Sequence, residues 1–256
     1  MKIICAKIMP IIKMSLFSMV AVTLAFLVTF INAGTLFFGH ASRLVPIYSV
    51  ERNEKKVALT FDAAWGSDKT EKIVSILKEN NVQGTFFLVG FWIEANKDMV
   101  KMIDEAGLDI GTHSSTHPQM SKLSESQIEK ELSNSMNLIQ EITNKKVEYF
   151  RPPYGDYNDT LINVATGLGL KTIQWDVDTL DWKGLSASEI LSRVKSSAKN
   201  GSIILCHNNS DHIIEALPLI IDYLKSENYE MVKISDLVYK SNYTIDNNGT
   251  QKQNVK

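Results

Sequence analysis

Two histidines, His113 and His117, lie four residues apart in the segment His-Ser-Ser-Thr-His and are the first chemical signal in the chain. In a short turn or helix this spacing lets both imidazoles contact one metal ion, and neutral imidazole suits zinc or a related divalent metal such as cobalt. In the alternative interpretation, residues 114–116 form a polar loop and both imidazoles bind backbone groups. The pair follows a predicted strand, and this context favours metal binding.

Asp62 follows the mainly apolar run 57–61, which is typical of a buried strand. A carboxylate in that place is partly buried and needs a partner to stay ionised. Arg151, directly before two prolines, is the candidate partner, because a guanidinium can hold a carboxylate through two parallel hydrogen bonds. The same two residues could also form a purely structural ion pair.

His207 ends the apolar run 203–206 and could act as a general acid. Asp176, Asp178 or Asp181, all within the segment 175–182, could supply a negative charge that raises the pKa of this histidine. Trp182 and the other tryptophan of the segment could wall a pocket the size of a sugar. A single histidine at a strand end is more often part of the core, but the other polar strand ends favour a functional role.

The order of elements that must position these residues predicts an α/β fold. Strands are expected at Val57, Thr85, Ile110, Tyr149, Lys171, Ile203 and Met231, and helices over 67–80, 98–106, 124–143, 159–168, 187–199 and 211–226. Apolar strands alternating with helices indicate a parallel sheet, and about seven strands indicate a distorted (β/α)7-8 barrel. An open doubly wound sheet is the alternative. In a barrel, the candidate residues would meet at the C-terminal ends of the strands.

The N-terminal segment is predicted to be a single transmembrane helix, because residues 14–42 contain no Lys, Arg, Asp or Glu. Lysines precede it, so the start of the chain is expected in the cytoplasm and the catalytic domain outside. A cleaved signal peptide is the alternative. Residues 1–42 are therefore predicted to be a membrane anchor or signal segment, 43–56 a linker, 57–240 the catalytic domain and 241–256 a disordered tail.

Composition argues against two classes of partner. The chain of 256 residues has a formal net charge of −2 and no basic run interleaved with aromatic residues, so nucleic-acid binding is not expected. No glycine-rich phosphate loop occurs, so nucleotide binding is not expected either.

The five segments together resemble the polysaccharide deacetylase family, also called carbohydrate esterase family 4 or the NodB-homology domain. The resemblance covers about residues 56–238 and rests on Thr-Phe-Asp at 60–62, His-Ser-Ser-Thr-His at 113–117, Arg-Pro-Pro-Tyr-Gly at 151–155, Asp-Thr-Leu-Asp-Trp at 178–182 and Leu-Cys-His at 205–207. It implies a distorted barrel that removes acetyl groups from N-acetylated sugars of a cell-wall glycan.

The resemblance also implies roles for individual residues. Asp62 would be the general base, oriented by Arg151, and His207 the general acid, paired with Asp181. His113 and His117 would hold a divalent metal, zinc or cobalt. The motifs further imply substrate-binding roles for Pro152, Tyr154, Trp182 and Leu205.

One residue departs from the family pattern, because Ala63 occupies the position of a metal-binding aspartate. A methyl group cannot coordinate a metal, so occupancy should be low. This variant, together with the N-terminal segment, is similar to the sporulation-associated, PdaB-like subgroup and implies peptidoglycan as substrate. The alternative is a weak or inactive glycan-binding pseudoenzyme.

Overall fold

The computed structural model describes residues 19–20, 22–25 and 43–254. The chain from Leu44 onward forms one compact unit, and residues 1–43 form another. Residues 19–20 and 22–25 are helical, and no helix within the described ranges is long and apolar enough to cross a membrane. The rest of the predicted anchor lies outside the described residues.

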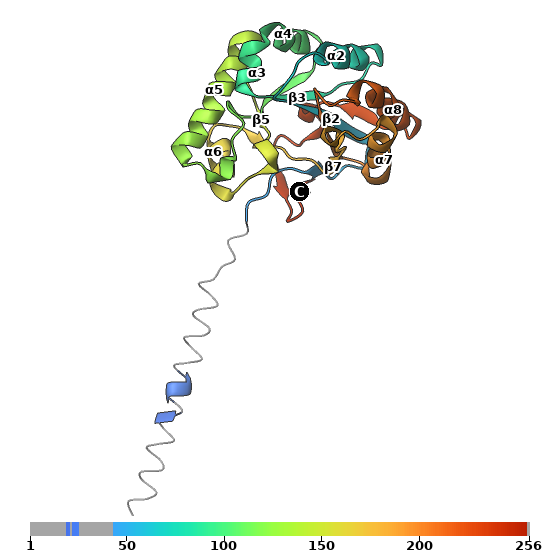
Figure 1. The fold of residues 1–256 in the computed structure, drawn as a ribbon. Coiled ribbons are helices and arrows are strands. Elements are labelled where there is room, and N and C mark those ends of the chain that lie inside the picture. Colours follow the sequence, from blue (N-terminus) through green and yellow to red (C-terminus); the bar gives the residue numbers. More distant parts are fainter. Residues whose placement is uncertain (1–18, 21, 26–42, 255–256) are drawn as a thin grey trace, which may run out of the picture. The chain divides into compact units, whose positions relative to one another are not determined.

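Strands and helices alternate along the compact unit (Figure 1). The strands are β1 (Ser49–Val50), β2 (Lys56–Ala63), β3 (Thr85–Leu88), β4 (Asp109–Thr112), β5 (Tyr149–Phe150), β6 (Lys171–Thr172), β7 (Val177–Asp178), β8 (Ile203–His207), β9 (Glu230–Val232), β10 (Tyr243–Ile245) and β11 (Thr250–Gln253). The helices are α2 (Thr70–Glu79), α3 (Gly90–Ala95), α4 (Lys97–Glu105), α5 (Glu125–Thr143), α6 (Asp159–Gly167), α7 (Ala187–Ser197), α8 (Ile213–Ser226) and α9 (Ile234–Leu237).

The main sheet is parallel, and its strands run in the order β6-β5-β4-β3-β2-β8-β7, with β9 paired to the first residues of β2. All seven predicted strands are present, and β7 is an additional one. No ladder joins β6 to β7 in the part of the chain that the structure describes, so the sheet is an incompletely closed barrel. This arrangement brings the C-terminal ends of the strands to one face.

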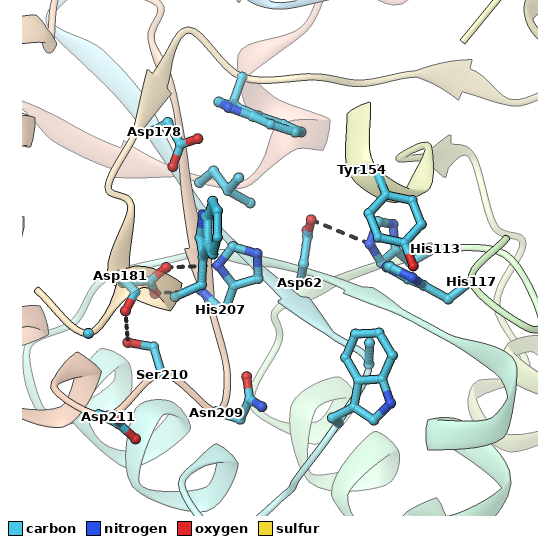
Figure 2. Close-up of a pocket in the computed structure, with 16 residues that line it drawn as sticks. Asp62, His113, His117, Tyr154, Asp178, Asp181, His207, Asn209, Ser210 and Asp211 are labelled. Carbon is cyan, nitrogen blue, oxygen red and sulfur yellow. Dashed lines mark hydrogen bonds and ion pairs between the residues drawn. The ribbon is translucent and has the colours of Figure 1, made fainter. Parts of the chain in front are cut away.

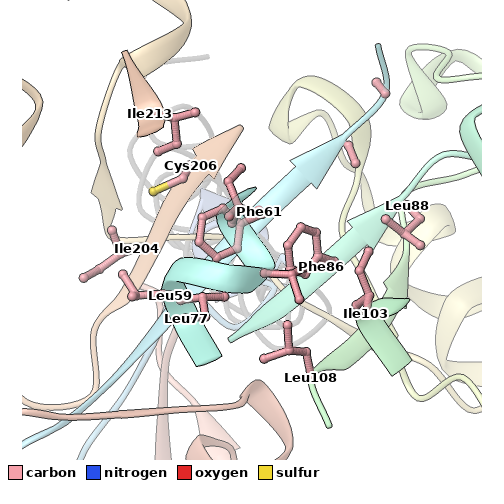
Figure 3. Packing of buried hydrophobic residues seen from close by; sticks show 14 of the residues in the cluster. Leu59, Phe61, Leu77, Phe86, Leu88, Ile103, Leu108, Ile204, Cys206 and Ile213 are labelled. Atoms are coloured by element: carbon pink, nitrogen blue, oxygen red, sulfur yellow. The ribbon is translucent and has the colours of Figure 1, made fainter. Parts of the chain in front are cut away.

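The core lies mainly between the sheet and its helices. In β2, Val57, Leu59 and Phe61 belong to this layer, and Phe61 stacks on Phe86 of β3 with ring centroids 4.9 Å apart (Figure 3). Because successive side chains of a strand point to opposite faces, the residues between them face the barrel interior. Asp62 is thus placed inside the barrel, at the end of its central strand.

The predicted linker over 43–56 is wrong as a boundary, because the barrel already includes Ile47 and Val50, each 1% exposed. The Ile47 N–H donates to Thr172 O at 2.9 Å, and the Val50 N–H donates to Gly201 O at 2.9 Å. A Cβ at Gly201 would come within 1.6 Å of Val50 O, so only glycine permits this approach. Short paired segments like this one have little hydrophobic periodicity, and the charged residues beside them make them resemble a linker in the sequence.

The predicted disordered tail is also wrong for residues 241–254. β10 and β11 form an antiparallel hairpin, and β11 pairs in parallel with β1. Gln251 is fully buried; its Oε1 accepts from Tyr239 N at 2.8 Å and its Nε2 donates to Tyr239 O at 3.0 Å. The polar composition suggested disorder, but backbone pairing and this satisfied amide stabilise the segment.

Candidate active site

A cavity of about 730 Å³ opens at the C-terminal ends of the strands. It is lined by Asp62, Ala64, Trp65, His113, His117, Tyr154, Trp175, Asp178, Asp181, Trp182, Gly184, Leu205, His207, Asn209, Ser210 and Asp211. Figure 2 shows Asp62 between the imidazole pair on one side and His207 with Asp181 on the other. Residues from five distant segments therefore meet in one place, as expected for a site on this face of a barrel.

Asp62 is a buried carboxylate with a buried cation beside it. Arg151, with no exposed surface, donates from Nη1 to Asp62 Oδ1 at 2.7 Å and to Thr60 Oγ1 at 2.9 Å, and from Nη2 to Gln174 O at 3.1 Å. Burial raises the pKa of Asp62, but the charges of Arg151 and the nearby histidines outweigh it and hold the pKa below its ordinary value. The carboxylate is therefore ionised at neutral pH.

The expected pair of parallel hydrogen bonds between these two side chains is not formed. Arg151 binds only Oδ1, because its second terminal nitrogen is taken by the Gln174 carbonyl. Oδ2 instead faces His113, whose Nε2 is 3.6 Å away. One carboxylate oxygen is thus anchored and the other is directed towards the imidazole pair.

His113 is held in one tautomer. Its Nδ1–H donates to Arg151 O at 2.7 Å, which leaves Nε2 without a proton in the neutral ring. Burial lowers the pKa of His113, and burial followed by the charge of His113 lowers that of His117 to about 4. Both imidazoles are therefore neutral at pH 7 and can act as ligands.

The donor set suits a cation but is one ligand short of a three-ligand centre. The His113 Nε2 lone pair and the Asp62 carboxylate face each other at 3.6 Å, and this arrangement favours a proton or a metal cation between them. His117 Nδ1 is buried and makes no hydrogen bond with the described residues. Ala63 is fully buried in the core layer, and within the described ranges no group of three His, Cys, Asp or Glu side chains is arranged to hold a metal. Two imidazoles fit a zinc-like ion, and a third dedicated ligand is missing.

His207 lies across the ladder from Asp62, since the two are register partners in β8 and β2. Its Nδ1–H donates to Asp181 Oδ1 at 2.7 Å, and its backbone N–H donates to Oδ2 of the same carboxylate at 2.7 Å. Burial lowers the pKa of His207, but the hydrogen bond and the charge of Asp181 outweigh it, so the net pKa is raised. The imidazolium is stabilised where it can give up a proton to the cavity.

The predicted substrate-binding residues are only partly brought together. Tyr154, Trp182 and Leu205 line the cavity, and the first two are 64% and 58% exposed. Pro152 is buried and is not among the lining residues. Arg151 also lies outside the cavity, behind Asp62, in agreement with an orienting role.

Sequence reasoning missed the loop residues of the site. Trp65, which follows β2, is 56% exposed, and its ring packs edge-on against His117 with centroids 4.9 Å apart. Asn209, Ser210 and Asp211 follow β8 and also line the cavity. Their position directly after two site-bearing strands was the available signal, because loops at these strand ends form the sites of such barrels.

Comparison with known proteins shows that the chain is similar to polysaccharide deacetylases. Residues 49–173 match the profile of the polysaccharide deacetylase family. A peptidoglycan-N-acetylglucosamine deacetylase of Bacillus cereus is 32% identical over 208 residues, which are 80% of this chain and 76% of that protein. The uncharacterized protein YlxY of Bacillus subtilis is 34% identical over 75% of this chain, but the chain spans only 60% of the length of YlxY.

Solved structures share the fold. A family 4 carbohydrate esterase pseudoenzyme of Bacillus anthracis is 38% identical, with a TM-score of 0.73, and the match covers 75% of this chain and 68% of that one. A mutant of the same pseudoenzyme with restored enzymatic activity is 40% identical, with a TM-score of 0.73 and coverage of 75% and 71%.

Proposed function

Because the chain belongs to the polysaccharide deacetylase family, we propose that it removes acetyl groups from the N-acetylated sugars of peptidoglycan. The observation that carries this proposal is the pairing, across one cavity, of a carboxylate whose pKa is lowered with an imidazole whose pKa is raised. Asp62 and His207 have pKa shifts in opposite directions, as an acid and a base that work together require. A module that only binds glycan has no need of both.

In the proposed reaction, Asp62 Oδ2 accepts a proton from the water that attacks the acetyl carbonyl, while Arg151 keeps Oδ1 in place. His207 then donates its proton to the leaving amine, and Asp181 stabilises the imidazolium until that transfer. The C–N bond then breaks to give acetic acid and the free amine, which ionise to acetate and ammonium. Asp62 is left with the proton of the water and His207 without one, and proton exchange with solvent restores both groups. A divalent metal held by His113 and His117 would supply Lewis acidity at the acetyl oxygen.

The second candidate is a glycan-binding pseudoenzyme, and Ala63 favours it. A buried methyl stands where the family pattern has an anionic ligand. Losing that ligand should weaken metal binding by more than the roughly 10–100-fold loss that is typical when a residue next to a ligand is changed. The likeness to the Bacillus anthracis pseudoenzyme supports the same alternative.

Two measurements on the soluble unit from Leu44 onward separate the candidates: metal content after dialysis against zinc or cobalt, and acetate release from N-acetylglucosamine oligomers and peptidoglycan fragments. The deacetylase proposal expects acetate release that depends on added metal. If no metal binds at millimolar concentration and no acetate appears, the binding function stands and the catalytic one fails.

We further propose that the protein acts outside the cytoplasm on the wall or spore cortex of a spore-forming bacterium, held by the predicted anchor over 14–42. The uncharged length of that segment and the Bacillus relatives support this. Fractionation of cells with an alkaline carbonate wash tests it, since an integral anchor keeps the protein in the membrane pellet and a cleaved signal releases it.

A further inference from the structure

The turn between the two imidazoles, residues 114–116, is bonded to α3 through its carbonyl groups. The Gly90 N–H donates to Ser114 O at 2.9 Å, and the Phe91 N–H donates to Ser115 O at 3.2 Å. A Cβ on Gly90 would lie 2.9 Å from both Cα and O of Ser115, so α3 approaches as closely as a backbone can. One side of the turn is thereby fixed.

The other side of the turn is bonded to a single residue of α5, Glu131. Its Oε2 accepts from the backbone N–H groups of Ser115 at 2.9 Å and Thr116 at 2.8 Å, and its Oε1 accepts from Thr116 Oγ1 at 2.8 Å. Ser115 Oγ also donates to the Glu131 carbonyl at 2.8 Å. Bonds to an ionised carboxylate are roughly twice as strong as those between neutral groups.

The turn needs this external support because its backbone is strained. Ser114 and His117 have φ values of 70° and 58°, in the left-handed region that residues other than glycine rarely adopt. His117 has one local stabilising contact, from its N–H to Ser114 Oγ at 3.0 Å. Without Glu131, Ser115 and Thr116 would lose their backbone N–H partners and could relax towards ordinary dihedral angles.

We propose that Glu131 is a positioning residue that sets the separation of the His113 and His117 imidazoles, whose ring centroids are 4.9 Å apart. It touches neither ring and acts through the backbone turn between them. The proposal rests on the metal-binding role proposed for the two histidines, but the positioning effect can be measured without metal or glycan. Its consequence is that the weak two-imidazole site depends on a preformed geometry that a flexible turn would not provide.

Three variants test the proposal. Glu131→Ala removes all side-chain acceptors. Glu131→Gln keeps one acceptor oxygen, which can accept from the two N–H groups, while its NH2 group can donate to Thr116 Oγ1 in place of the lost acceptor. Glu129→Ala is the matched control, since Glu129 is an exposed glutamate on the same helix.

The decisive readout is amide hydrogen exchange at Ser115 and Thr116 in the metal-free protein, with the ring shifts of both histidines followed by NMR. Glu131→Ala should speed exchange at both amides by at least about tenfold and shift the His117 ring signals, while exchange at β2 stays unchanged. Glu131→Gln should retain most of the protection, and Glu129→Ala should retain all of it. As a second readout, Glu131→Ala should weaken zinc binding by about tenfold or more.

Unchanged amide exchange and unchanged ring shifts in Glu131→Ala would overturn the proposal. It would also be overturned if Glu131→Gln and Glu129→Ala lost as much amide protection as Glu131→Ala. If Glu131→Ala does not fold, Glu131→Met keeps the apolar stem, removes only the acceptors and carries the same expectations. A protected turn in a protein that releases no acetate would refute the proposed function and leave this positioning role intact.

Discussion

Replacing Arg151 by methionine tests the electrostatic basis of the site most directly. The guanidinium has no exposed surface and neutralises Asp62, which is 6% exposed, through a 2.7 Å contact. Removing one partner of a buried ion pair leaves the other charge uncompensated, so Arg151→Met should lower the free energy of unfolding at pH 7 by about 3–5 kcal/mol. Urea denaturation of the unit from Leu44 onward measures this loss.

The pH dependence follows from the direction of the pKa shift. In the parent protein the pKa of Asp62 is lowered, so its stabilising contribution is present above the ordinary aspartate pKa and is lost only as pH falls through the lowered value. Without the guanidinium, burial dominates and raises the pKa, so the variant loses stability as pH rises through that raised value. The stability gap between Arg151→Met and the parent should therefore widen from about pH 4 to pH 7.

The control is the double-mutant cycle with Asp62→Asn. Because neutral asparagine does not need a counter-charge, Arg151→Met should cost less in that background, with a coupling energy of at least about 1.5 kcal/mol. The argument that this pair is electrostatically coupled is refuted if the stability losses of the two single substitutions add within about 0.5 kcal/mol and the stability gap between Arg151→Met and the parent does not change with pH.

Four further outcomes are expected. Asp62→Asn should reduce acetate release by at least about 100-fold while the histidine pair still binds metal, and retained turnover would remove Asp62 from the base role. Ala63→Asp should tighten zinc binding by more than about 10–100-fold and raise acetate release; isothermal titration with a matched acetate assay checks both, and higher occupancy at an unchanged rate would show that position 63 is wrongly assigned. Asp181→Asn should lower the pKa of His207 and move the alkaline limb of the pH–rate profile to lower pH, since the bond and charge that raise this pKa are lost; an unmoved limb and an unmoved NMR titration would contradict the pairing. Gln251→Ala should lower the free energy of unfolding by about 1–3 kcal/mol, because it leaves the part-buried backbone N–H and carbonyl of Tyr239 unpaired, and a cost near zero in urea denaturation would mean that the C-terminal hairpin contributes little.

The elements with strong local signals could be predicted from the sequence. The run ending at Asp62 is apolar because β2 is buried on both faces, and seven of its eight residues are buried. The long helix α5 begins after Ser124 because its hydroxyl and the Gln127 side chain form a capping box. Polar residues at the ends of such strands must share one face of a parallel barrel, and for this reason the meeting of the five motifs was foreseeable.

The remaining features depend on contacts between distant segments. β7 has two residues and no periodicity of its own, so only its pairing with β8 identifies it. The single bond from Arg151 to Asp62 depends on the carbonyl of Gln174, whose position is set by the backbone path after β6. Trp65 follows the site-bearing strand β2, but this position does not give the side chain a partner, and only the structure shows its packing against His117.

The hydrogen bonds that residues 44–50 make with the rest of the compact unit limit how far the chain can be shortened from its N-terminal side. Leu44 N–H donates to Asp159 Oδ1 at 3.0 Å, and the backbone of Ile47 bonds both Thr172 and Gln174, the latter through a 2.7 Å contact. Gln174 in turn accepts from Arg151, so mechanical tension applied ahead of Leu44 would be transmitted to the guanidinium through two successive hydrogen bonds. A protease that removed the chain through Ile47 would therefore leave the Gln174 N–H without this partner and loosen the support of Arg151.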